Sequence, residues 1–176
     1  MTATKIKFCG ILAPDALEAA IDARAEWCGL VFFPPSPRNL SLSDARLLAA
    51  QAARRIGKVG LFVDPDDALL AEGVAAGSLD AIQLHGDETP ERAAHLRARF
   101  GLPVWKVIAV ASAADIARAE GYREAADLIL FDPGAPVVIH ADALRSKSKN
   151  SPFDGRRLQG KVLLTVVGGR IVHDAR

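Results

Sequence analysis

Short apolar segments alternate with segments of helical pattern up to residue 132, and this alternation constrains the fold more than any other feature of the chain. Most apolar segments carry hydrophobic residues at consecutive positions, which indicates strands buried on both faces of a parallel sheet covered by helices. No G-x-G-x-x-G sequence follows the first segment, so six strand–helix units in a row favour a TIM-type (β/α) barrel of the α/β class over a dinucleotide-binding sheet. The predicted strands are residues 6–11, 28–32, 58–63, 81–84, 104–108 and 127–132.

Residues that favour helix ends bound the segments between these strands. Ala13-Pro14-Asp15 suits a first helical turn, because proline fits the first position and aspartate complements the helix dipole. Ser41 or Ser43 and Thr89 are candidates for helix N-caps, and Gly101 is a candidate for a C-cap. The predicted helices run from 13 to about 27, from 41 or 43 to 55, from 64 to about 77, from 89 to 100 and from 113 to 120.

Composition argues against several classes of partner. The chain of 176 residues has a formal net charge of +1, which gives no electrostatic case for binding nucleic acid or a membrane surface. Its sequence contains neither a signal-peptide core nor an apolar run long enough to span a bilayer, so we expect a cytoplasmic protein. The two cysteines, Cys9 and Cys28, form no C-x-x-C pair of the kind that binds metals.

The segment after Asp132 does not continue the strand–helix alternation. Residues 137–139 could form a short strand, and a basic polar loop follows at 145–152. Two apolar runs then flank Gly168-Gly169, which predicts an antiparallel hairpin, since parallel neighbours need a crossover of a dozen or more residues. We therefore predict a partial barrel over residues 1–132 and a β-rich tail over 133–176, packed on or beside the barrel.

Five motifs at predicted strand ends resemble one known family. In chain order they are Lys7-Phe8-Cys9-Gly10-Ile11, Leu30 to Pro34 with Ser36-Pro37-Arg38, Val59 to Val63, Gln83 to Glu88, and Leu130-Phe131-Asp132. Residues 5 to about 132 thus resemble phosphoribosylanthranilate isomerase of tryptophan biosynthesis, a (β/α)8 barrel.

The tail resembles a different family. Residues 146–155, 160–162 and 165–170 look like the C-terminus of a dihydroorotase. An alternative is that Phe153-Asp154 and Val167-Gly168-Gly169 are diverged forms of segments of the isomerase itself. Dihydroorotase chemistry is not expected, because a binuclear zinc site typically opens with an H-x-H pair, which the four histidines of this chain do not form.

The isomerase resemblance implies an Amadori rearrangement of a phosphosugar, without a metal or organic cofactor. It implies that Cys9 is the general base and Asp132 the general acid. Lys7 lies two positions before Cys9, so the two side chains share one face of a strand, and positive charge there favours a reactive thiol. Arg38, on a loop stiffened by three prolines, resembles the residue that pairs with the anthranilate carboxylate. Gln83 and His85 also share a face, and we expect them to bind substrate.

Each of these residues also fits a purely structural role when it is taken alone. Cys9 could be a small buried hydrophobe in a strand, and Asp132 could cap the turn before Pro133. Arg38 could be a solvated loop residue, and His85 a structural histidine.

Two functions therefore stay open at this stage. The first is an active isomerase, and the second is a truncated or fused isomerase-like protein with little or no catalysis. The second arises because barrels of this type bind phosphate in the loops after strands seven and eight, which the tail replaces. In either case the chain could form a homo-oligomer that covers open sheet edges.

Overall fold

The structure of the chain is a computed structural model that describes the backbone of residues 5–110, 113–132, 136–138, 157–159, 164–167 and 170–174, and the side chains of 5–110 and 114–130. In chain order the elements are β1 (Lys7–Cys9), α1 (Pro14–Asp22), β2 (Trp27–Phe32), α2 (Leu42–Ala52), β3 (Gly57–Phe62), α3 (Asp67–Gly77), β4 (Ala81–Leu84), α4 (Pro90–Phe100), β5 (Val104–Ala109), α5 (Ala113–Arg118), the 3-10 turn η1 (Ala119–Tyr122), β6 (Leu128–Asp132), β7 (Pro136–Val138), β8 (Arg157–Gln159), β9 (Leu164–Val167) and β10 (Arg170–Asp174).

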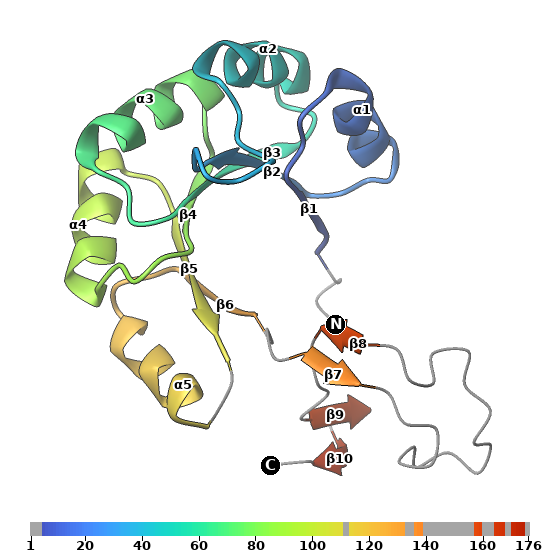
Figure 1. Ribbon diagram of the computed structural model, residues 1–176, viewed down its shortest axis with the longest axis vertical. Helices are drawn as coiled ribbons and strands as arrows, with labels where there is room; N and C mark the ends of the chain where they lie inside the picture. Colours follow the sequence, from blue (N-terminus) through green and yellow to red (C-terminus); the bar gives the residue numbers. More distant parts are fainter. Residues whose placement is uncertain are drawn as a thin grey trace. The chain divides into compact units, whose positions relative to one another are not determined.

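The first six strands form one sheet in sequence order, β1-β2-β3-β4-β5-β6. Neighbours from β1 to β5 pair in parallel, for example Cys9 with Gly29 and Gly29 with Val59. The sheet curls, and helices α1 to α4 lie along its outer side (Figure 1). The predicted (β/α) barrel class is therefore confirmed, with six strands of the barrel type in the sheet.

Helix starts follow the capping residues read from the sequence. The hydroxyl of Ser41 accepts a hydrogen bond from the Asp44 backbone N–H at 3.0 Å, so Ser41 and not Ser43 is the N-cap of α2. Thr89 caps α4 in the same way through the Arg92 backbone N–H, and Gly101 ends that helix at a φ of +64°.

Several helix ends differ from the predictions. Helix α2 stops at Ala52 and not at Arg55, because Ala53 leaves the helical conformation at a φ of +47°. Helix α3 begins at Asp67 and not at residue 64, because Asp66 is its N-cap. Helix α1 stops at Asp22 and not near Trp27, because Trp27 already belongs to β2, where it pairs with Lys7 and Gly57. Arg24 turns the chain between them at a φ of +56°. The helix predicted over 113–120 is α5 followed by the 3-10 turn η1.

The core has two layers, one on each face of the sheet. Between sheet and helices, the rings of Phe32 and Phe62 stack with centroids 5.2 Å apart, and both side chains are fully buried. On the inner face, the indoles of Trp27 and Trp105 meet edge to face at 5.0 Å. Val59 and Ala81 pack with Trp105 there. Apolar burial of this extent dominates the stability of such a sheet.

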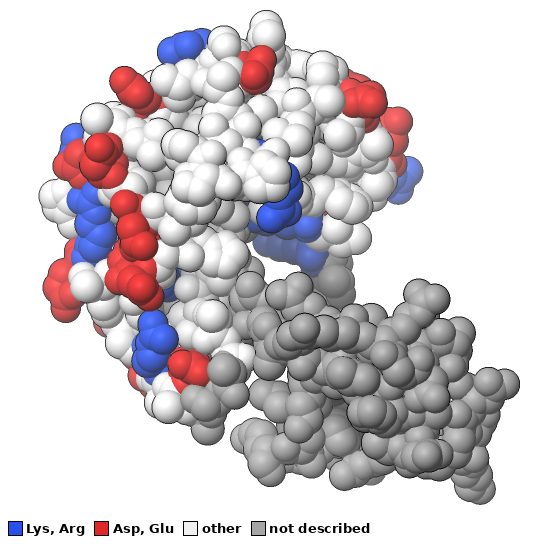
Figure 2. All heavy atoms as spheres, in the orientation of Figure 1, with Lys and Arg blue, Asp and Glu red and all other residues white. Residues whose placement is uncertain are grey.

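Ion pairs tie neighbouring helices together on the outer surface. Asp67 of α3 pairs with Arg92 and Arg99 of α4. Figure 2 shows acidic and basic side chains close together on this part of the surface. Glu18 of α1 pairs with Arg55, just after α2, at 2.7 Å. None of the helices formed by the described residues is both long enough and apolar enough to cross a membrane.

Contacts divide the chain into two compact units, Met1–Val107 with Gly121–Leu130, and Ile108–Glu120 with Phe131–Arg176. In the second unit β7 pairs with β8, and β9 with β10, both antiparallel. The antiparallel pairing predicted for the two runs around Gly168-Gly169 is thus confirmed, although those two glycines lie outside the described residues. The domain boundary after Asp132 stays a prediction.

Candidate active site

Two strands place polar side chains together at the carboxyl end of the sheet. Lys7 and Cys9 share a face of β1, as their spacing predicts, and the Lys7 ammonium lies 3.4 Å from the Cys9 sulfur. The same ammonium donates a 2.7 Å hydrogen bond to Oε1 of Gln83 on β4. Cys9 is exposed and Gln83 is buried. The structure therefore brings three of the predicted site residues into direct contact.

A glycine on β2, the neighbour of β1 in the sheet, leaves the space that this arrangement needs. Gly29 of β2 is the register partner of Cys9. A Cβ at Gly29 would lie 2.9 Å from the Cys9 sulfur and 3.2 Å from Cε of Lys7. Any side chain at this position would displace one or both groups, so the absence of a side chain is part of the site.

Arg38 reaches the same end of β1 from the proline-rich loop. The Ser36 hydroxyl accepts a hydrogen bond from the Arg38 backbone N–H at 3.1 Å, and the Leu40 N–H bonds to the Val31 carbonyl at 2.9 Å. These bonds fix the loop beside β2. The Arg38 side chain then crosses Gly10, whose φ is +83° and where an added Cβ would lie 2.5 Å from Cδ of Arg38. Arg38 is thus placed next to the residue that follows Cys9.

The remaining predicted residues lie at other strand ends. His85 follows β4 and is exposed, with its backbone N–H bonded to the Phe62 carbonyl at 2.9 Å. Asp132 is the last residue of β6, and its side chain lies outside the described residues. Substrate contact by His85 and the acid role of Asp132 both stay predictions.

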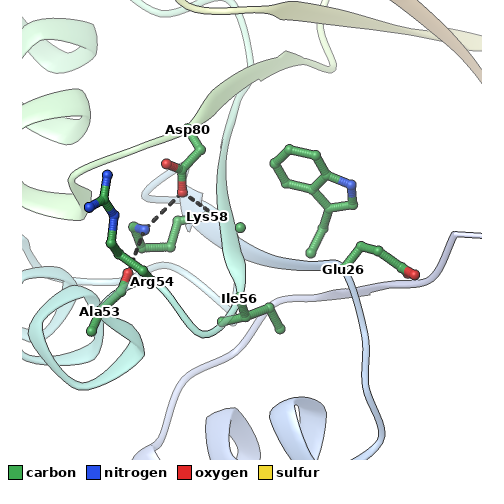
Figure 3. A pocket seen from close by; sticks show the side chains of 8 residues that line it. Glu26, Ala53, Arg54, Ile56, Lys58 and Asp80 are labelled. Atoms are coloured by element: carbon green, nitrogen blue, oxygen red, sulfur yellow. Dashed lines mark hydrogen bonds and ion pairs between the residues drawn. The ribbon is translucent and has the colours of Figure 1, made fainter.

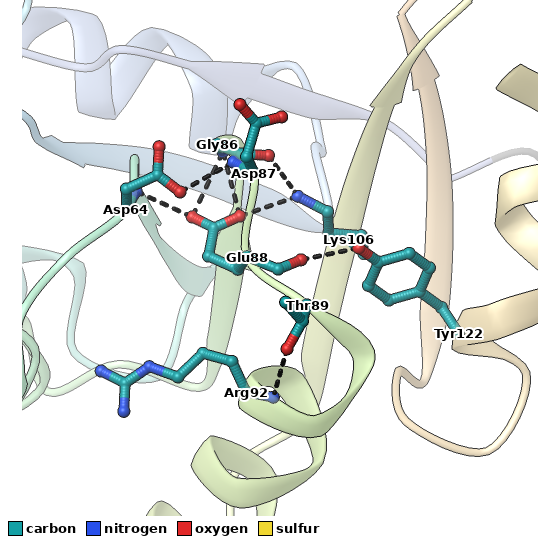
Figure 4. Close-up of polar contacts among 8 residues, drawn as sticks. All are labelled: Asp64, Gly86, Asp87, Glu88, Thr89, Arg92, Lys106 and Tyr122. Carbon is teal, nitrogen blue, oxygen red and sulfur yellow. Dashed lines mark hydrogen bonds and ion pairs between the residues drawn. The ribbon is translucent and has the colours of Figure 1, made fainter.

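A buried ion pair at this end of the sheet was not predicted from the sequence. Nζ of Lys106 on β5 lies 2.7 Å from Oε2 of Glu88, and their side chains are 1% and 2% exposed (Figure 4). The available signal was a lysine within the otherwise apolar strand Val104–Ala109, because lysine is almost never fully buried unless it is paired.

This pair fixes two loops. The Glu88 carboxylate accepts the backbone N–H of Asp64 at 2.9 Å and that of Gly86 at 3.0 Å. Lys106 donates to the Gly86 carbonyl at 2.5 Å, and the Tyr122 hydroxyl donates to the Glu88 carbonyl at 2.6 Å. Because the two charges are paired and each makes further hydrogen bonding to the backbone of Asp64 or Gly86, the pair holds the loop that carries His85 against β5.

The two cysteines have opposite surroundings. Cys28 is 1% exposed, and burial raises the pKa of its thiol to about 11. Cys9 is exposed beside an ammonium group. Only Cys9 therefore has the access that acid–base chemistry requires.

A cavity of about 380 Å³ lies at the opposite end of the strands (Figure 3). Trp27, Gly57 and Lys58 line it at the start of β2 and β3, together with Asp80 before β4. The Lys58 ammonium is already bound by Asp80 at 2.8 Å and by the Ala53 carbonyl at 3.1 Å. In barrels of this type the amino-terminal ends of the strands serve stability, and we assign this cavity no chemistry.

Among the described residues, no group of three or more His, Cys, Asp or Glu side chains is placed to hold a metal ion. The described part of the site offers instead one thiol, one ammonium, one guanidinium and one amide. Such a set can bind an anionic substrate and move a proton at a carbon atom.

Comparisons with known proteins agree on one family. The model of the family described as N-(5'phosphoribosyl)anthranilate (PRA) isomerase matches residues 6–151, and so extends past residue 132, where the sequence resemblance was predicted to end. N-(5'-phosphoribosyl)anthranilate isomerase of Rhodopseudomonas palustris (strain HaA2) is 48% identical over 158 residues, which cover 90% of this chain and 71% of the relative. The Paramagnetospirillum magneticum protein of the same name is 50% identical over 132 residues, which cover 75% of this chain and 61% of the relative.

Solved structures give the same result. A monomeric form of the dimeric phosphoribosylanthranilate isomerase from Thermotoga maritima has a TM-score of 0.67 at 32% identity, covering 74% of this chain and 65% of that chain. A phosphoribosylanthranilate isomerase in complex with reduced 1-(o-carboxyphenylamino)-1-deoxyribulose 5-phosphate has a TM-score of 0.66 at 31% identity, again covering 74% and 65%. The chain spans about two thirds of the length of these relatives.

Proposed function

Because the chain belongs to the N-(5'-phosphoribosyl)anthranilate isomerase family, we propose that it catalyses the Amadori rearrangement of N-(5'-phosphoribosyl)anthranilate to the 1-deoxyribulose 5-phosphate aminoketose, a step of tryptophan biosynthesis. The single observation that carries this proposal is the exposed Cys9 thiol with the Lys7 ammonium 3.4 Å from its sulfur, at the carboxyl end of β1. Chemistry in this type of barrel takes place at that end of the strands.

The reaction needs one acid and one base. In the proposal, Asp132 donates a proton to the furanose oxygen, the ring opens, and the nitrogen lone pair forms an iminium at C1. Cys9, as the thiolate, then removes the proton from C2, and the electron pair of that bond gives an enolamine. The enolamine tautomerises to the ketone, so no atoms are gained or lost. A thiolate at Cys9 would lie in contact with the positive charge of Lys7.

Arg38 is proposed to bind the anthranilate carboxylate. A guanidinium offers two parallel N–H donors that match the two carboxylate oxygens. The support is positional, since the Arg38 side chain crosses Gly10, directly after Cys9. We also propose that Gln83 and His85 contact the sugar.

A second candidate function is a family member that folds but catalyses poorly. The observation in its favour is that β7–β8 and β9–β10 pair antiparallel, whereas strands seven and eight of a complete barrel pair in parallel. Phosphate binding supplies much of the energy that positions a phosphosugar, so a weakened phosphate site would reduce turnover. The resemblance of residues 146–170 to a dihydroorotase C-terminus also stays a proposal.

Self-association is proposed on two grounds. Ile6 and Phe8 leave large apolar side chains 47% and 45% exposed at β1, the first strand of the sheet. A structural neighbour in the same family is described as a dimeric enzyme. Covering such a strand with a second copy would remove apolar surface from water.

The test is a steady-state assay of the purified full chain, in which loss of phosphoribosylanthranilate fluorescence is followed and the aminoketose product is identified by mass. Turnover proportional to enzyme concentration supports the proposal. Folded protein without turnover at saturating substrate would favour the second candidate.

A further inference from the structure

The Lys7 side chain makes two contacts with groups that are far apart in the sequence. One is with the Cys9 sulfur at 3.4 Å on its own strand, and the other is with Oε1 of Gln83 at 2.7 Å on β4. We propose that Gln83 is a positioning residue that holds the Lys7 ammonium against the Cys9 sulfur, and that Gly29 supplies the space for it. This inference deepens the proposed function and rests on it only for the role of Cys9 as base.

The chemistry of the contact sets the orientation of the Gln83 amide. An ammonium group can only donate hydrogen bonds, so the amide atom that faces Lys7 must be the oxygen. Gln83 is 3% exposed, and its side chain therefore cannot exchange this partner freely with bulk water. A lysine has a long stem with many rotamers, and a fixed buried acceptor selects the rotamer that also reaches Cys9.

Gly29 makes the short path between the two strands available. To reach β4 from β1, the Lys7 side chain must extend past β2 and β3, and the residue of β2 in register with Cys9 is Gly29. An added Cβ would lie 3.2 Å from Cε of Lys7 and 2.9 Å from the Cys9 sulfur. The position of the Lys7 ammonium thus depends on the amide oxygen of Gln83, which accepts its hydrogen bond, and on the absence of a side chain at Gly29.

The consequence concerns the reactivity of Cys9. An ammonium held in contact with the sulfur offsets the negative charge of the thiolate, which is the form that accepts a proton from carbon and that attacks electrophiles. Without the Gln83 oxygen as acceptor, we expect the Lys7 ammonium to be solvated by water and to lie away from the Cys9 sulfur. Gln83 therefore acts on Cys9 through Lys7.

The test measures Cys9 alkylation by iodoacetamide at pH 7, followed by mass spectrometry of the peptide that contains Cys9. The full chain is compared with Lys7→Met, Gln83→Met and the double variant. Lys5→Met is the matched control, because it removes an exposed lysine of the same charge two positions before Lys7. Gln83→Asn, which keeps the amide but shortens its reach, provides a second test if Gln83→Met does not fold. All rates are recorded well below the thermal transition of each variant.

The proposal predicts that Lys7→Met and Gln83→Met each slow alkylation roughly fivefold, the factor that corresponds to about 1 kcal/mol for two unit charges about 4 Å apart in a water-like medium. The double variant should be no slower than the slower single variant, since both changes remove the same contact. Gly29→Ala should also slow the reaction, and Lys5→Met should leave it unchanged.

Parental rates in both Gln83 variants, or fully additive effects in the double variant, would overturn the inference. Because alkylation does not require turnover, the outcomes separate the two proposals. If the effects of Lys7→Met and Gln83→Met on the alkylation rate are not additive but the chain has no isomerase activity, the positioning role is supported and the proposed function is wrong. An active isomerase whose Gln83→Met variant keeps the parental alkylation rate removes the positioning role and leaves the proposed function intact.

Discussion

Lys7 on β1 and Gln83 on β4 are 76 positions apart in the chain, and the curl of the sheet brings them within a 2.7 Å hydrogen bond. This contact joins strands that have two other strands between them in the sheet order. It forms across the inner face of the curled sheet, and Gly29 of β2 leaves room there for the Lys7 side chain. The candidate site thus depends on the barrel-type curvature of the sheet.

Arg38 should affect substrate binding more than turnover. Replacing it with alanine removes a bidentate contact with a carboxylate, and we expect KM to rise by an amount equivalent to about 1.5–3 kcal/mol. Arg38→Lys should not restore KM, because an ammonium is a point donor without the fork geometry. Steady-state kinetics on the three proteins would check this, and equal KM values would place Arg38 outside the site.

The Glu88–Lys106 pair should be important for stability. Lys106→Met leaves the Glu88 carboxylate buried without its cation, at an expected cost of about 3–5 kcal/mol in the free energy of unfolding. The double variant Glu88→Gln with Lys106→Met removes both charges and should recover part of that loss. Urea unfolding monitored by tryptophan fluorescence measures these free energies. A Lys106→Met variant as stable as the parent would show that the pair is not needed.

The two cysteines should react at very different rates. The pKa of about 11 and the burial of Cys28 predict that, at pH 8, a thiol reagent modifies Cys9 rapidly and Cys28 only after unfolding. Labelling followed by mass analysis should find one modified thiol in the native chain and two in urea. Rapid modification of both thiols in the folded protein would contradict this description of the core.

The link between Glu18 and Arg55 should make stability depend on pH. Hydrogen bonds from Arg55 and Gln51 lower the pKa of Glu18 from 4.5 to about 2. The folded state thus binds this proton more weakly than the unfolded state, so the contribution is fully present above pH 4.5 and is lost as the pH falls toward 2. The pair is exposed, and we expect a modest effect that salt reduces.

The check compares the thermal transition of the parent with that of Glu18→Gln across this range. The gap between the two transition temperatures should close as the pH falls from about 4.5 to 2. A gap that is independent of pH would exclude titration of Glu18 as its origin.

Much of the fold could be predicted because local signals agree with the tertiary structure. Ser41, Thr89 and Gly101 mark helix ends by their own hydrogen bonds or backbone angles. The end of α1 was missed because parallel pairing draws Trp27 into β2, and a helical pattern does not report long-range pairing.

The site could be predicted in part. The spacing of Lys7 and Cys9 predicts a shared face, and the structure confirms it. The contact with Gln83 and the gap at Gly29 depend on sheet curvature, which residue spacing along one strand does not define. The lysine within an apolar strand is visible in the sequence and indicates a buried partner. The pattern along that strand does not identify this partner as Glu88, because Glu88 lies in a loop that only the tertiary fold brings next to Lys106.

In the proposed reaction, Cys9 and Asp132 carry out the proton transfers of the isomerisation. The most direct measurement is the kcat of Cys9→Ser and Asp132→Asn, with Cys28→Ser as the matched control at a buried thiol. Each of the first two variants should lower kcat by roughly two to four orders of magnitude with little change in KM, while the control stays near the parent. An active parent chain whose Cys9→Ser variant retains the parental kcat would contradict the role of Cys9 as base.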